Sequence, residues 1–167
     1  MSNFQSVESW IVAQDIAETS TTQKVPLGTI IRAEDKASTG YGIGEFIYLL
    51  GVGSTAVGNV VVYNPDNFST TRASANAIGP VAVAMSANVG SQYGWYQISG
   101  KGAASVLAGF LDNADCYLTG TAGSVDDTDV AGDYISGMKG ASAVDTPSTG
   151  LAEVELWRPF VRDGLDN

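Results

Sequence analysis

The sequence predicts an all-β protein, a small β-barrel or β-sandwich of about eight to ten short strands with an extended N-terminal arm. Apolar or alternating runs recur about every eight to twelve residues along the chain. Glycine is abundant, with 20 among 167 residues, and interrupts these runs. No segment carries a sustained helical period. The length suits one compact domain.

Residues 1–23 form the predicted arm, and residues 24–167 form a single β domain with a short C-terminal tail. Large apolar side chains stand in a polar setting in the arm, and the candidates for contact with another subunit or surface are Phe4, Val7, Trp10 and Ile11. Because the arm has no core of its own, we expect it to pack against either its own β domain or a neighbouring subunit.

The first strands of the β domain are expected at residues 25–32, 45–50 and 57–63. Pro26 suits an edge strand or the start of a strand, because proline cannot donate to a strand ladder. Residues 45–50 are almost wholly apolar and β-branched or aromatic, which predicts burial on both faces. Residues 64–67, with sequence NPDN, have the chemistry of a turn.

Two strands are expected in the middle of the chain. Residues 81–86 alternate between large side chains and Ala or Ser, so one face carries the bulk while the other lets a neighbouring backbone approach. Residues 93–100 form the next strand. Residues 103–111 fit a 3.6-residue period in part, but the glycines around them weaken a helix, and a strand is favoured.

The last strands are expected at residues 117–119, 134–138 and 152–157. Apolar and acidic residues alternate in the last of these, which is typical of a half-exposed strand. Pro159 is expected to end it.

One aromatic cluster is a candidate binding surface. Tyr93, Trp95 and Tyr96 lie within four residues of each other and offer rings that can stack on a sugar or pack in a subunit interface. The alternative is that the cluster packs inside the protein.

Composition disfavours catalysis. The chain contains no histidine, which removes histidine-based nucleophilic catalysis and histidine-ligated zinc. Cys116 is the one cysteine, and it is expected to be a small buried hydrophobe. The carboxylates Glu45, Glu153 and Glu155 are best explained as an exposed polar face. We expect no enzymatic activity and no cofactor.

An acidic run at residues 126–133 resembles part of a calcium-binding loop. Asp127, Asp129 and Gly132 occupy the first, third and sixth positions, but Ala131 and Met138 stand where oxygen ligands belong. A solvated surface loop is the better interpretation, and no metal site is predicted.

Charge limits the possible partners. Eight basic and 18 acidic residues give a formal net charge of −10, which repels the phosphates of nucleic acids and anionic membranes. The N-terminal residues lack the basic and apolar regions of a signal peptide, so synthesis in the cytoplasm and a soluble product are expected.

Four parts of the sequence together resemble the head decoration (cement) proteins of tailed bacteriophages. They are PLGTIIRA (26–33) leading to YGIGEFIYL (41–49), VAVAM (81–85) leading to YGWYQISG (93–100), TAGSV (121–125) through GDYISG (132–137), and the closing hairpin GMK (137–139) with AEVEL (152–156). The resemblance covers about residues 25–160. It is a pattern of glycine-spaced strands without an invariant chemical motif.

This resemblance implies a structural virion protein. Such a protein is a small β subunit, often a homotrimer, that binds the major capsid protein on the capsid exterior and stabilises the shell. It would be made in the host cytoplasm and end in the virion, with the arm residues as candidate contacts. The alternative is a carbohydrate- or receptor-binding β module of a phage fibre or adhesin, with Tyr93, Trp95 and Tyr96 as its platform.

Overall fold

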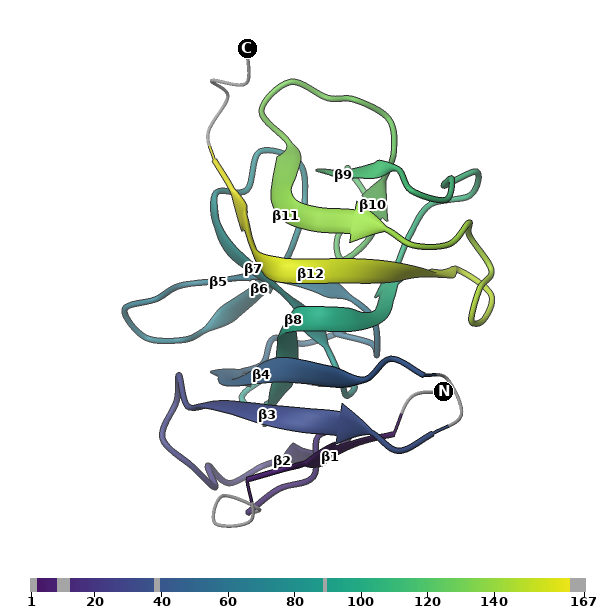
Figure 1. Cartoon of the computed structure of the whole chain (residues 1–167). Coiled ribbons are helices and arrows are strands. Elements are labelled where there is room, and N and C mark those ends of the chain that lie inside the picture. The colour runs from purple at the N-terminus through teal and green to yellow at the C-terminus, as the bar shows by residue number, and fades with distance from the viewer. Residues whose placement is uncertain (1–2, 9–12, 38–39, 89, 163–167) are drawn as a thin grey trace.

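The computed structural model describes residues 3–8, 13–37, 40–88 and 90–162, and these residues form strands and turns without a helix (Figure 1). The all-β prediction is therefore confirmed. The twelve strands are β1 (Phe4–Ser6), β2 (Thr19–Ser20), β3 (Ile30–Asp35), β4 (Ile43–Leu50), β5 (Val60–Tyr63), β6 (Thr70–Arg72), β7 (Gly79–Ala84), β8 (Tyr93–Ser105), β9 (Asp115–Leu118), β10 (Val125–Asp126), β11 (Tyr134–Gly140) and β12 (Leu151–Val161). They outnumber the expected eight to ten because several are only two or three residues long. No helix that could cross a membrane occurs among the described residues.

The strands form one antiparallel sheet, in the order β1-β3-β4-β8-β7-β12-β11-β9-β10. Strand β2 adds to β8, and β5 pairs with both β6 and β7. Within the described residues the end strands β1 and β10 do not pair with each other, so the sheet is open rather than a closed barrel. The arm belongs to this sheet, since β1 pairs with β3 and β2 pairs with β8.

Strand β8 links the two ends of the molecule. Its first half pairs with β4 through residues 93–99, and its second half pairs with β12 through residues 99–105. At the change of partner Gly100 has φ +94°, and a Cβ there would lie 2.8 Å from the carbonyl oxygen of Ile43. Only glycine tolerates both conditions. The buried Gln97 side chain donates from Nε2 to the carbonyl oxygens of Ser99 (3.1 Å) and Lys101 (3.0 Å), which holds the bend.

Three buried clusters stabilise the fold. The aromatic core lies under the arm and contains Phe4, Ile16, Ile31, Ala33, Tyr41, Phe46, Tyr48 and Trp95. The aliphatic core contains mainly Val, Ala, Ile, Leu and Met side chains of β5, β7, β9, β11 and β12, with Phe110 as its one buried aromatic ring among the described residues. The third core lies between β4, β5, β7 and β8 and contains Ile47, Leu49, Val61, Ala82, Ala84, Tyr96 and Ile98.

The predicted burial patterns are borne out in β4 and in β7. Residues 46–49 of β4 are buried on both faces. In β7, Val81 and Val83 enter the aliphatic core, while the small Ala82 and Ala84 enter the third core beside the Tyr96 ring. Of the ambiguous segment 103–111, residues 103–105 belong to β8 and the rest form a bridge and turns.

Pro159 does not end the last strand, which continues to Val161. It lies in a β-bulge, where the pairing of β12 with β11 shifts register between Met138 and Ser136. Beyond the bulge β12 leaves β8 and pairs with β7. Because residues 157–159 of β12 lie opposite Gly137 alone, the ladder is interrupted at Pro159 and proline is tolerated there, so the expectation that it ends the strand is wrong.

Candidate functional site

One face of the sheet collects exposed aromatic, apolar and paired charged side chains. The strand register places Trp157 of β12 opposite Ser99 of β8, Ser99 opposite Glu45 of β4, and Glu45 opposite Arg32 of β3. Paired residues on neighbouring strands point to the same side of a sheet. We call this surface the Trp157 face; it comprises Arg32, Glu34, Ile43, Glu45, Ser99, Lys101, Lys139, Glu153, Glu155, Trp157, Arg158 and Phe160.

The bulge in β12 shapes the centre of this face. Arg158 has φ +46°, in the left-handed region that non-glycine residues seldom adopt. Trp157 and Arg158 are consecutive and yet both exposed, whereas their neighbours Leu156 and Pro159 are buried. A regular strand would send one of the two inward, and the bulge instead directs both to solvent. Opposite the bulge, Gly137 of β11 is required because a Cβ there would lie 2.7 Å from the carbonyl oxygen of Trp157.

Trp157 is 60% exposed, far more than is usual for a residue that large. A shallow hollow of about 210 Å³ lies beside the ring and is lined by Gly100, Lys101, Glu155, Leu156 and Trp157. Gly100 contributes no side chain, so the hollow is open above the strand. A lysine, a glutamate and a tryptophan therefore border it. In the cross-strand direction, Trp157 has only Ser99 on β8 and Gly137 on β11 beside it.

Ion pairs surround the exposed ring. Lys101 Nζ lies 2.8 Å from Glu153 Oε2, and Arg158 Nη2 lies 3.2 Å from Glu45 Oε2. Further pairs join Arg32 to Glu8 (3.6 Å), Lys139 to Asp115 (3.8 Å), and Lys36 to Glu34. Surface pairs of this kind contribute about 0–1 kcal/mol each to stability, so their main effect here is on the local charge.

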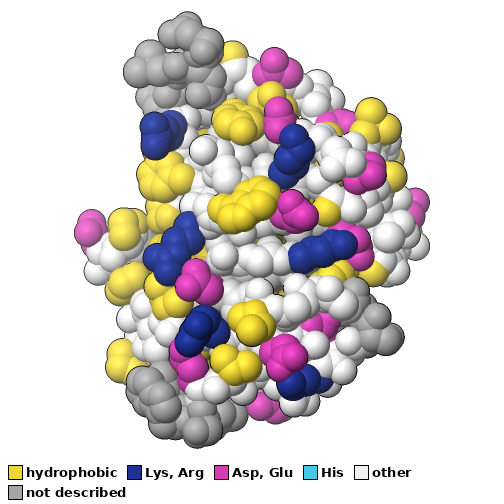
Figure 2. Space-filling view, in the orientation of Figure 1, with side chains coloured by type: hydrophobic (Ala, Val, Ile, Leu, Met, Phe, Trp, Pro, Cys, Tyr) yellow, Lys and Arg dark blue, Asp and Glu magenta, His cyan; other side chains and the backbone are white. Residues whose placement is uncertain are grey.

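Positive charge is concentrated on this side of the molecule. The Trp157 face contains four of the eight basic residues and four acidic residues, so its formal net charge is zero. The rest of the chain therefore carries the whole of the total of −10. Figure 2 shows blue and magenta side chains interspersed with hydrophobic ones across this face. The result is a nearly neutral, mixed surface on an otherwise strongly acidic protein.

The aromatic cluster predicted from the sequence lies elsewhere, mostly inside the protein. Trp95 and Tyr96 are both completely buried, on opposite faces of β8: Trp95 is in the aromatic core and Tyr96 in the third core. Tyr93 is half-buried, and its ring stacks on Tyr48 at a centroid distance of 6.3 Å. For Trp95 and Tyr96 the interpretation as a glycan platform or interface is corrected, because β8 is covered on both sides at these two positions. The core-packing alternative is the one that the structure supports.

The four arm residues predicted as contacts have different surroundings. Phe4 is buried in the aromatic core, with its ring 4.8 Å from that of Phe46, so it is held by its own chain. Val7 is 45% exposed and available to a partner. Trp10 and Ile11 lie outside the described residues.

The polar residue Gln14 fastens the arm, and no apolar pattern in the sequence marks it. Its Nε2 donates to the carbonyl oxygens of Glu18 (2.8 Å) and Tyr93 (3.0 Å). Its Oε1 accepts from the Tyr48 hydroxyl (2.6 Å), and its carbonyl oxygen accepts from Trp95 Nε1 (3.0 Å). Both polar atoms of this buried side chain therefore have partners, and Gln14 accepts a hydrogen bond from each of two buried aromatic residues, through its side chain from Tyr48 and through its backbone from Trp95.

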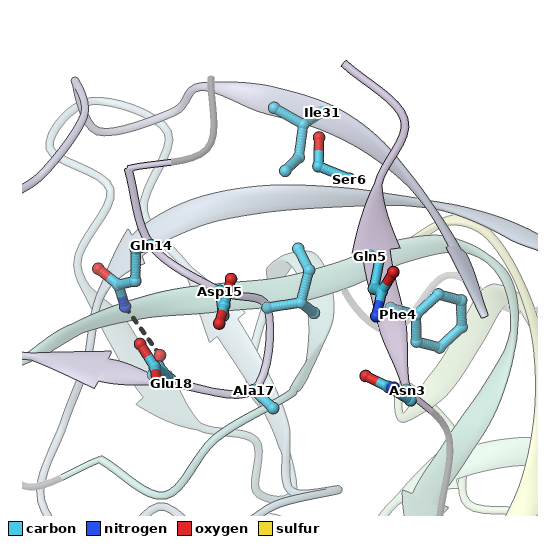
Figure 3. Close-up of a pocket in the computed structure, with 10 residues that line it drawn as sticks. Asn3, Phe4, Gln5, Ser6, Gln14, Asp15, Ala17, Glu18 and Ile31 are labelled. Carbon is cyan, nitrogen blue, oxygen red and sulfur yellow. Dashed lines mark hydrogen bonds between the residues drawn. The ribbon is translucent and has the colours of Figure 1, made fainter. Parts of the chain in front are cut away.

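A cavity of about 470 Å³ lies between β1 and the segment that contains Gln14 (Figure 3). Its apolar lining comes from Phe4, Ile16 and Ile31, and its polar lining includes Asp15 and Glu18. The segment joining its two walls includes residues 9–12, which lie outside the described residues. The cavity belongs to the packing of the arm, and the Gln14 amide at its edge is committed to the hydrogen bonds given above.

The other residues singled out in the sequence have structural surroundings. Cys116 is buried in the aliphatic core, and burial raises the pKa of its thiol to about 12. In the acidic run, Asp133 is buried and accepts from the Asn76 amide (2.6 Å), while Asp127 accepts from the Leu111 amide (3.0 Å). Within the described residues no group of three or more Cys, Asp or Glu side chains is placed to hold a metal ion.

No protein-family model matches the chain, and a search of curated proteins finds no match either.

Proposed function

We propose that this protein is a decoration (cement) protein of a tailed-bacteriophage particle. It self-associates as a homotrimer and binds the capsid exterior through the major capsid protein, which it braces without catalysing a reaction. It is made in the host cytoplasm and ends on the virion. The glycine-spaced strands that resemble this family support the proposal, and they fall in β3, β4, β7, β8, β11 and β12.

The observation that carries the proposal is the Trp157 face. Trp157 is 60% exposed on a surface with a net charge near zero. Hydration of this large apolar side chain is unfavourable, and its burial against another protein would be favourable. Tryptophan and arginine are the side chains most enriched among residues that dominate binding energy. The bulge presents one of each, side by side, from a sheet that is packed on its other side.

The fold also suits a bracing role. The arm is fastened to the sheet by strand pairing and by Gln14, and strand β8 pairs with β2 of the arm, with β4 and with β12. Load applied to one part of such a subunit is carried along paired strands rather than by loops. The strongly acidic remainder of the surface keeps the subunit away from packaged nucleic acid.

Binding to shells tests the proposal. The chromosomal neighbours of the gene identify the candidate major capsid protein, which is then assembled into shells and sedimented with the purified chain. The expected result is co-sedimentation at a fixed ratio of chain to capsid subunit and a higher temperature of shell disruption. A chain that stays in the supernatant and leaves shell disruption unchanged refutes the proposal.

A second candidate function is favoured by the hollow beside Trp157. The hollow of about 210 Å³ joins an exposed indole with Lys101 and Glu155, groups that hydrogen-bond sugar hydroxyls, which fits a carbohydrate- or receptor-binding module. Binding of labelled glycans on an array, abolished by Trp157→Ala and kept by the exposed-loop variant Leu111→Ala, supports this function. An array without signal removes it.

A further inference from the structure

The Trp157 face has three properties that belong together in a contact between proteins. Its apolar members Trp157, Ile43 and Phe160 are 60%, 58% and 40% exposed. Ion pairs lie around them. Its backbone consists of paired strands with one bulge, and paired strands change little on binding.

Charge decides which partner can approach. Two copies of this chain carry −10 each and repel one another over most of their surfaces. The Trp157 face has a formal net charge of zero, so contact between copies costs least electrostatic work there. A strongly acidic partner would gain nothing from this face, and a strongly basic one would find more attraction on the remaining surface, which carries the whole −10.

The arrangement of charges also makes the face complementary to itself. Each ion pair contains one basic and one acidic side chain, and the pairs Arg158–Glu45 and Lys101–Glu153 come from different strands of the same face. When two such faces meet, a basic group of one copy can face an acidic group of the other without a change in net charge. Contacts that bring the same residues of several copies together around a symmetry axis require this kind of self-complementarity.

We propose that a second copy of this chain docks on the Trp157 face, with Trp157 as the central buried residue of the contact. The inference rests on the self-association in the proposed function, and it assigns the surface responsible. The capsid then meets another part of the subunit, so self-association and shell binding are separable by mutation.

The experiment measures the oligomeric state in the absence of shells. Sedimentation velocity and light scattering are recorded at about 1–100 μM for the wild-type chain, Trp157→Ala and Leu111→Ala. Leu111 is as exposed as Trp157 (63%) but lies in a turn among acidic residues, so it is the matched control. We expect an oligomer for the wild type and Leu111→Ala, and an increase of about 30-fold or more in the dissociation constant for Trp157→Ala.

Charge variants test the electrostatic part. Lys101→Glu with Arg158→Glu takes the face from 0 to −4 and is expected to give a monomer. Glu45→Arg with Arg158→Glu keeps the local pair and its net charge, and is expected to associate within a few-fold of wild type. Unchanged thermal unfolding of each variant establishes that the fold is intact; this check is needed because Arg158 is exposed whereas Lys101 and Glu45 are partly buried.

Three results overturn the inference: a wild-type chain that is monomeric at 100 μM, a Trp157→Ala chain that associates like wild type, or a charge-reversed chain that still associates. A monomer that binds shells would refute this inference and the homotrimer of the proposed function, and leave the capsid role standing. A chain that dissociates on Trp157→Ala as expected but binds no shell would keep the inference and refute the capsid role.

Discussion

The aromatic core and the aliphatic core are closed in different ways. The aliphatic core is covered by strands that pair along much of their length, such as β11 with β12 and β12 with β8. The aromatic core is covered by the arm, which pairs through three residues in β1 and two in β2. Its closure depends instead on two buried apolar side chains, Phe4 and Ile16, and on the hydrogen bonds of Gln14.

This difference predicts unequal stability within one sheet. Hydrophobic burial without polar partners tolerates small movements, whereas a buried amide that serves several partners works only in one position. Loss of the arm should therefore destabilise the strands around the aromatic core more than the strands around the aliphatic core.

Deletion of residues 1–23 should produce the largest effect. It exposes the aromatic core and leaves the Tyr48 hydroxyl and Trp95 Nε1 without the partner they have in Gln14. Loss of the burial of Phe4 and Ile16, at about 1.5–3 kcal/mol each, and of these hydrogen bonds amounts to roughly 5–10 kcal/mol. Hydrogen exchange should show loss of protection in β3 and β4 and retained protection in β11 and β12. Equal loss in all four strands would show that the two cores form one cooperative unit.

Neighbouring positions on β12 should differ sharply. Leu156 is completely buried in the aliphatic core and Trp157 is exposed. Leu156→Ala should lower the free energy of unfolding by about 2–5 kcal/mol, because it leaves a cavity in a packed core. Trp157→Ala, its control, should change it by no more than about 0.5 kcal/mol. Urea titration of both variants measures the difference, and a large loss for Trp157→Ala would mean that the ring is part of the folded core.

Gln14→Ala should have a smaller effect confined to the arm. It removes an amide whose oxygen and nitrogen serve Tyr48, Tyr93 and Glu18, leaving buried groups unpaired at a cost of about 2–3 kcal/mol. Gln23→Ala is the matched control, because Gln23 is exposed and bonds only the nearby carbonyl of Val25. The near-ultraviolet circular dichroism of the aromatic core and urea titration report the change. Equal stability of the two variants would remove Gln14 as the anchor.

The strands could be predicted from the sequence because their side chains obey local rules. The two-sided burial of residues 46–49 follows from a continuous apolar run, and the outward position of Trp157 follows from the alternation over residues 152–157. That alternation was a usable signal for the Trp157 face. The adjacent aromatic residues Trp95 and Tyr96 were interpreted as a candidate binding surface, and this was wrong because a strand with both faces covered buries consecutive residues.

Other features could not be read from the sequence. The hydrogen bonds of Gln14 reach residues 34 and 81 positions away, and no local pattern specifies such partners. The bulge at Arg158 depends on the register of β11 against β12 and on the close approach of Gly137, both of which are tertiary facts. Pro159 therefore signalled an irregularity correctly, but whether it ended or bent the strand was decided by its neighbours.

The smallest predicted effect is a pH dependence that originates in the aliphatic core. Burial raises the pKa of the Cys116 thiol from 9.0 to about 12, so the folded state keeps a proton that the unfolded state releases above pH 9. The stability contributed by the neutral thiol is complete below pH 9 and is lost as the pH rises from 9 towards 12, at about 1.4 kcal/mol per unit. Tyr96, whose pKa burial raises to about 12, adds to the loss only above pH 10. Urea titration between pH 8.5 and 10 should therefore show that the free energy of unfolding of the wild type falls with pH. The Cys116→Ala variant should show a smaller slope, even where the substitution lowers its free energy of unfolding at neutral pH. An identical slope for the two proteins would mean that the thiol titrates normally and that the aliphatic core is open to water at β9.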